Sequence, residues 1–74
     1  MKYELLWLSS KDRQLYSNYA STKKELKSKL DYFVNVMGLK LNDTDRFDNI
    51  QVSKRIKKDH YQILSENDVL NEIN

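Results

Sequence analysis

Hydrophobic and polar residues alternate in two segments near the start of the chain. Residues 3–8 carry aromatic and aliphatic side chains at every second position, and Leu6 and Leu8 make the second face apolar too, which is typical of a strand covered on both faces near its end. Residues 14–20 alternate more weakly and are more polar, which indicates an antiparallel strand near a sheet edge. The polar stretch 9–13 predicts the turn that joins them into a β-hairpin.

The strongest helix signal covers residues 22–37. Thr22 and Glu25 have the spacing of a capping box, in which the hydroxyl of Thr22 accepts from the amide of Glu25 and the Glu25 carboxylate reaches back to the Thr22 amide. Gly38 is the only glycine, and it stands where a helix commonly ends in left-handed backbone. Between these limits, one apolar stripe at helical spacing contains Leu26, Leu30, Phe33, Val34 and Met37.

The second half of the chain repeats the hairpin pattern. Residues 50–56 and 60–64 alternate around the polar turn 57–59 and predict two further strands. A second capping pattern precedes residues 66–73, which predicts a short C-terminal helix. The predicted fold is a small single α+β domain spanning residues 1–74 with ββαββ order, in which two β-hairpins form an antiparallel sheet packed on one central helix.

Composition limits where the protein is expected to act. The 74 residues are 39% hydrophobic and 11% aromatic, which suits one small folded domain. There is no cysteine, so disulfides and thiolate metal sites are excluded, and no apolar run reaches the length of a membrane span. We therefore expect a cytoplasmic protein without membrane association. The bias towards Lys, Asn, Asp and Ile resembles coding by an AT-rich genome, and it leads us to predict a phage or mobile-element accessory protein in the host cytoplasm.

Groups for catalysis, cofactor binding and metal binding are sparse. His60 is the only histidine, and a nucleophilic triad requires a histidine that a third group orients. One glycine cannot build a glycine-rich phosphate loop, and the acidic loop 42–49 departs from the calcium-loop pattern at Phe47 and Asp48. We therefore predict no enzymatic activity, no cofactor and no metal.

Two groups of side chains are candidates for partner binding. The first group is basic, lies at the two predicted hairpin turns and consists of Lys54, Arg55, Lys57, Lys58 and His60 at one turn with Lys11 and Arg13 at the other. A two-stranded hairpin tip such as that of Lys54 to His60 can enter a nucleic-acid groove, and Lys11 and Arg13 extend the patch if the two tips lie side by side. Lysines at turns also serve solubility. The second group is aromatic: Tyr16 and Tyr32 lie off the expected core faces, and exposed tyrosine commonly anchors a protein interface.

These features predict a small binding module that binds and modulates a host protein, for instance as an inhibitor. The alternative is a nucleic-acid-binding domain that uses the basic hairpin; the net charge of +2 is low for that function. A homodimer, joined at a strand edge or through the face of Leu6 and Leu8, is the third hypothesis.

Overall fold

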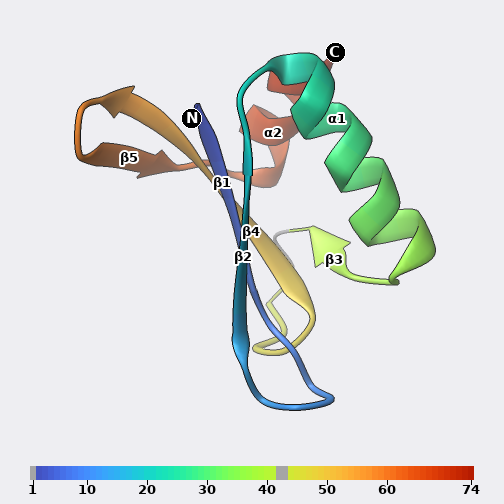
Figure 1. Ribbon diagram of the computed structural model, residues 1–74. Coiled ribbons are helices and arrows are strands. Elements are labelled where there is room, and N and C mark those ends of the chain that lie inside the picture. The colour runs from blue at the N-terminus through green and yellow to red at the C-terminus, as the bar shows by residue number, and fades with distance from the viewer. Residues whose placement is uncertain (1, 42–43) are drawn as a thin grey trace.

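The computed structural model describes residues 2–41 and 44–74 and has a mixed five-stranded sheet with two helices (Figure 1). The predicted α+β class is confirmed. In chain order the elements are β1 (Tyr3–Leu8), β2 (Leu15–Ala20), α1 (Lys23–Asp31), a π-helical segment (Tyr32–Val36), β3 (Lys40–Leu41), β4 (Asn49–Lys57), β5 (His60–Ile63) and α2 (Glu66–Ile73).

The sheet is built around two central strands, β1 and β4. β1 pairs antiparallel with β2 on one side and with β4 on the other, and Leu5 lies opposite Val52 in the second ladder. β4 is long enough to change its outer neighbour: its beginning pairs with β3 and its end pairs with β5. The two hairpins therefore meet along β1 and β4, and the second half of the β4–β5 hairpin extends beyond the body of the domain (Figure 1).

A short parallel strand, β3, interrupts the ββαββ order that the sequence predicts. Lys40 and Leu41 pair in parallel with Asn49 and Ile50, and the amide of Lys40 donates to the carbonyl of Asp48 at 2.8 Å. Two residues are too few to show an alternating pattern, so periodicity alone cannot reveal this strand. Its position follows from the helix that precedes it, because the chain must return from the helix end to the beginning of β4.

The first helix begins as the capping box predicts and ends differently. The Glu25 amide donates to the Thr22 hydroxyl at 3.1 Å, while the Glu25 carboxylate accepts from the Ser21 amide at 3.2 Å, one residue earlier than expected. After Asp31 the helix widens, and the amide of Met37 donates to the carbonyl of Tyr32 at 3.2 Å, five residues back. Such π turns are rare and commonly occur at functional sites.

The π turn changes which side chains are buried. It adds a residue to the helical repeat, so positions after Phe33 rotate away from the predicted stripe. Phe33 stays buried, whereas Val36 is 70% exposed and Met37 is 48% exposed. The prediction that Met37 belongs to the core is wrong for this reason. Gly38 then adopts the expected left-handed backbone, with φ of 79°.

The core lies between one face of the sheet and the two helices. β1 contributes every second residue to it, and both helices lie on that same side of the sheet (Figure 1). Leu26 and Leu30 come from α1, and Val69 comes from α2. In the described part of the chain, the buried apolar residues are Tyr3, Leu5, Trp7, Ala20, Leu26, Leu30, Phe33, Leu39, Ile50, Val52, Leu64 and Val69. Among residues 2–41 and 44–74, no helix covers the opposite face of the sheet.

Candidate functional site

An apolar groove lies between the β1–β2 hairpin and the end of the first helix. It has a volume of about 340 Å³ and is lined by Trp7, Ser9, Lys11, Asp12, Tyr16 and Met37. A neighbouring hollow shares Trp7 and Met37 and continues towards Gly38 and Asp48. The volume is near the lower end of the range of about 300–1,000 Å³ for pockets that hold small molecules. The groove is therefore at the small end of the size range of ligand pockets.

Two aromatic residues that line this groove, Trp7 and Tyr16, belong to a row of four aromatic rings. Trp7 stacks on Tyr16 with 5.6 Å between ring centroids and an interplanar angle of 16°. On its other side Trp7 contacts Phe33 at 4.8 Å, and Phe33 meets the edge of Tyr32 at 5.6 Å. Stacked and edge-to-face pairs add about 0.5–1.5 kcal/mol each beyond their buried area. The four rings are thus held in a fixed geometry before any partner binds.

Tyr16 lies on the helix-covered face of the sheet, not off it as the sequence suggested. It is the cross-strand partner of Trp7 and is 41% exposed because β2 is an edge strand. Its hydroxyl donates to the carboxylate of Asp12. This bond holds the pKa of Asp12 below its usual value, and Asp12 raises the pKa of the Tyr16 hydroxyl in return. The contacts with Trp7 and Asp12 therefore hold the partly exposed ring of Tyr16 in place.

The basic hairpin candidates lie at the far end of the β4–β5 hairpin, away from the groove. Arg55, Lys57, Lys58 and His60 are all exposed there, and the ladder shifts register between Arg55 and Lys57. Within the described part of the chain, no ion pair involves Arg55, Lys57 or Lys58. These four residues, named the basic tip below, extend beyond the body of the domain (Figure 1).

The two hairpin tips do not form one basic patch. β1 runs antiparallel to β4, so the turn that carries Lys11 and Arg13 lies at the opposite end of the sheet from the basic tip (Figure 1). Lys11 lines the apolar groove, and the Arg13 guanidinium lies over the ring of Phe47 at 5.5 Å. Two of the predicted binding residues, Lys11 and Tyr16, thus lie together at the groove.

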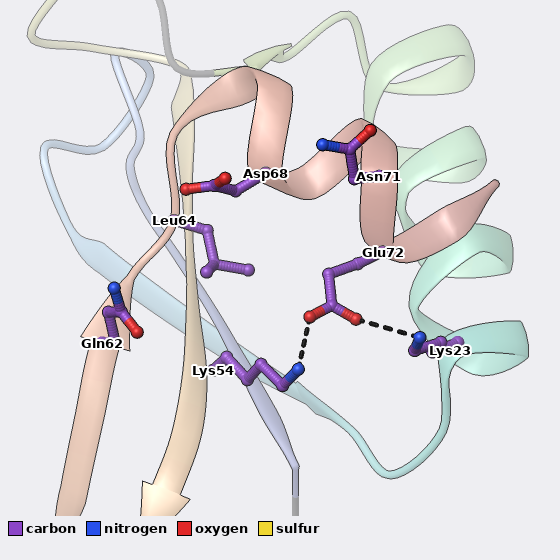
Figure 2. Close-up of a pocket in the computed structure, with 7 residues that line it drawn as sticks. All are labelled: Lys23, Lys54, Gln62, Leu64, Asp68, Asn71 and Glu72. Carbon is purple, nitrogen blue, oxygen red and sulfur yellow. Dashed lines mark hydrogen bonds and ion pairs between the residues drawn. The ribbon is translucent and has the colours of Figure 1, made fainter.

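Lys54 takes part in an internal contact instead. Its ammonium group donates to the carboxylate of Glu72, which also lies 3.4 Å from the Lys23 ammonium (Figure 2). The same carboxylate accepts from the Tyr3 hydroxyl at 2.9 Å. The bond from Lys54 is the largest cause that lowers the pKa of Glu72 to about 2, and burial is the largest cause that raises the pKa of Tyr3 to about 12. Glu72 therefore joins α2 to β1, β4 and the start of α1.

The acidic loop after β3 uses its described side chains for turn contacts. Asn42 and Asp43 lie outside the described residues. Asp45 pairs with Lys40, and Asp48 accepts from the Ser10 amide at 3.0 Å and from the Ser10 hydroxyl. Across residues 2–41 and 44–74 no group of three or more His, Cys, Asp or Glu side chains has the arrangement to hold a metal ion.

Sequence reasoning missed two residues that shape these sites. Met37 has the spacing of a core residue, and only the π turn exposes it at the groove. Glu72 lies on a short helix with acidic and apolar neighbours, and no local pattern marks it as the centre of a network. Its partners Tyr3 and Lys54 are 69 and 18 positions away in the sequence.

Comparison with protein-family models, with curated proteins and with solved structures found no match. In the described ranges, no helix has the length and apolar character that a membrane crossing requires.

Proposed function

We propose that this protein is a small, non-enzymatic binding module that acts by occupying a surface of another protein. The observation that carries the proposal is the apolar groove, which is lined by the ring stack of Trp7 and Tyr16 and by Met37. The partner we propose is a protein that presents a large apolar side chain to this groove. If the gene belongs to a phage or another mobile element, as the residue bias indicates, the partner is a host protein whose activity the module alters.

The shape and composition of the groove support this function. Aromatic side chains and methionine are enriched at protein interfaces, and the aromatic ones bury much apolar area while losing few rotamers. Met37 adds an unbranched side chain that adapts to different partner shapes. Lys11 and Asp12 at the rim provide polar contacts around the apolar centre, as in most interfaces.

Photo-crosslinking tests the proposal at the groove itself. A photoreactive amino acid at position 37 is compared with the same group at position 27, where Lys27 is exposed on α1 away from the groove. In lysate of the source organism, position 37 is expected to give one discrete protein adduct that position 27 does not give. Excess wild-type protein and excess Lys27→Glu are expected to compete the adduct away, whereas excess Met37→Glu is not. Equal adducts at both positions, or no protein adduct at position 37, would contradict the proposal.

A nucleic-acid-binding function through the basic tip is the second candidate. The observation that favours it is the exposure of all four side chains of the basic tip, with no internal ion pair among the described residues for Arg55, Lys57 and Lys58. A two-stranded ribbon of this kind fits a nucleic-acid groove. Its affinity would depend steeply on salt, because each neutralised phosphate releases a counterion.

The salt dependence of binding to random duplex DNA and to RNA tests this second function. A fall of about tenfold or more in affinity between 50 and 200 mM salt is expected if three cations contact phosphates. The double variant Lys57→Glu, Lys58→Glu should abolish binding. The matched control Lys24→Glu, Lys27→Glu reverses the same number of charges on exposed positions of α1 and should retain it. No binding at 50 mM salt, or equal losses in both double variants, would exclude the basic tip.

A further inference from the structure

The uncovered face of the sheet carries apolar side chains at its two ends and polar ones, among them Glu4, Ser17 and Gln51, between them. Cross-strand partners point to the same side of a sheet, so Leu8 shares this face with Leu15, and Ser53 shares it with Ile63. Leu15 is 69% exposed and Ile63 is 63% exposed, and Leu6 and Leu8 are only half-buried. An antiparallel sheet with one open face normally presents polar side chains there. Both helices lie on the other side of the sheet, so they do not shield these apolar side chains from solvent (Figure 1).

The two ends of this face differ in shape. At the end near the β1–β2 turn, a hollow of about 380 Å³ is lined by residues that include Leu6, Leu8, Leu15 and Arg46. At the other end, Tyr61 and Ile63 of β5 stand exposed on the extending hairpin. A surface with a hollow at one end and exposed apolar side chains at the other is complementary to a second copy of itself that is turned end for end.

We propose that a second copy of this chain packs face to face on the uncovered sheet, about a two-fold axis that lies between the two sheets. The axis exchanges the two ends, so Tyr61 and Ile63 of one copy fill the hollow at Leu8 and Leu15 of the other. This dimer uses the opposite side of the sheet from the apolar groove, so it is independent of the proposed binding function.

Pairing at the β2 edge, the other route to a sheet-mediated dimer, is obstructed. The outward amide of Tyr19 is bonded to the side chain of Asn18 at 2.8 Å, and the carbonyl of Tyr19 accepts from the ammonium group of Lys29. A strand added at this edge would have to displace both contacts, because it needs the same backbone groups. The uncovered face requires no such displacement.

The size of the face predicts a weak dimer. Strands lie about 4.8 Å apart and rise about 3.3 Å per residue, so six residues from each of β1, β2 and β4 with the four residues of β5 give about 350 Å² per copy. Two such faces give about 700 Å², which is below the 1,000 Å² or so that a stable specific interface exceeds. We therefore expect dissociation in the range of about 10–100 μM, which matches small interfaces.

Sedimentation equilibrium of the full chain between 5 and 500 μM tests the proposal. Wild type is expected to change from an 8.9 kDa monomer to a dimer across this range. Leu15→Glu and Ile63→Glu should each remain monomeric, while Val36→Glu, an equally exposed apolar position on the helix side, should dimerise like wild type. Circular dichroism and urea midpoints establish that all three variants fold.

Cysteine crosslinking tests the two-fold arrangement, and it is clean because the chain has no cysteine. In a mixture of Leu15→Cys and Ile63→Cys chains, the disulfide between the two variants should form at least tenfold faster than the disulfide between two identical chains. It should also form faster than any disulfide in mixtures that contain Val36→Cys. A chain that is monomeric at 500 μM would overturn the proposal and assign the face to another protein or to solvent. A dimer that survives either glutamate variant, or that Val36→Glu also abolishes, would overturn it as well.

Discussion

Replacing Glu72 by glutamine should remove part of the pH dependence that the stability of this protein has in the acid range. The Glu72 side chain is 13% exposed and receives contacts from Lys54, Tyr3 and Lys23. Glutamine has almost the same shape and can still accept the bond from Tyr3, but it removes the charge. The substitution therefore isolates the electrostatic part of the network from its packing.

The magnitude follows from the pKa of Glu72. Its pKa falls from 4.5 in the unfolded chain to about 2 in the folded protein, and a shift of that size corresponds to at most about 3 kcal/mol. The hollow around Glu72 is open to solvent, and the Lys54 side chain is 34% exposed, so solvent screens part of this interaction. We therefore expect Glu72→Gln to lower the free energy of unfolding by about 1–2 kcal/mol at pH 7, or about 4–16 °C in Tm.

The sign of the pH dependence is determined by the same shift. Because the folded pKa is lower than the unfolded one, the contribution of Glu72 is complete above about pH 4.5 and is lost as the pH falls towards 2. The wild type should lose stability across this window. The difference between wild type and Glu72→Gln should shrink from its full value at pH 7 to nearly zero at about pH 2.

Urea unfolding followed by the fluorescence of Trp7, the single tryptophan, measures this difference at several pH values between 2 and 7. Glu66→Gln is the matched control, because Glu66 is exposed on the same helix and no ion pair in the described residues involves it. The control should change stability by less than about 0.5 kcal/mol. Parallel pH profiles for wild type and Glu72→Gln, or equal losses in Glu72→Gln and the control, would refute the reasoning.

Three other predictions concern stability. Leu30→Ala should lower the free energy of unfolding by about 2–5 kcal/mol, because Leu30 is buried on α1. Leu70→Ala, at an exposed position of α2, should lower it far less. Similar urea midpoints for the two variants would show that Leu30 is not part of the core. Gly38→Ala should cost about 1–2 kcal/mol because φ is 79°, although no atom lies within 4 Å of the added methyl group; an unchanged Tm would contradict this left-handed helix end. Tyr3 should be the last tyrosine to ionise in an ultraviolet titration, because its pKa is about 12. Its contribution to stability should be complete below about pH 10 and be lost as the pH rises through 12. Tyr3→Phe should remove the last step of the titration, and a step that remains in this variant would belong to another tyrosine.

Local patterns were sufficient for the class of fold and the beginning of the main helix. The alternation at Tyr3, Leu5 and Trp7 corresponds to the buried face of β1, and the capping box places the helix start at Thr22. Both features depend on neighbours within a few positions, where side-chain direction follows directly from backbone period. The predicted ββαββ order failed at β3, because a two-residue strand has no period.

The candidate sites could be predicted only in part for a similar reason. Lys11 and Tyr16 were recognised as candidates by residue type. Their position beside Met37 depends on a π turn, and the spacing of apolar residues in the sequence does not predict that turn. Lys54 was grouped with its basic neighbours, although strand alternation turns it towards Glu72 and away from them. The separation of the two hairpin tips follows from the pairing of β1 with β4, which connects the two ends of the chain.

The amino-acid sequence by itself determined the α+β class, the alternating strands and the capped start of the helix, because these arise from interactions between residues close in the chain. The tertiary structure decided the parallel strand β3, the exposure of Met37 at the groove and the contact of Glu72 with Tyr3, which joins residues 69 positions apart. Such contacts require distant segments to meet in one arrangement, and the free energy of packing the whole core selects that arrangement.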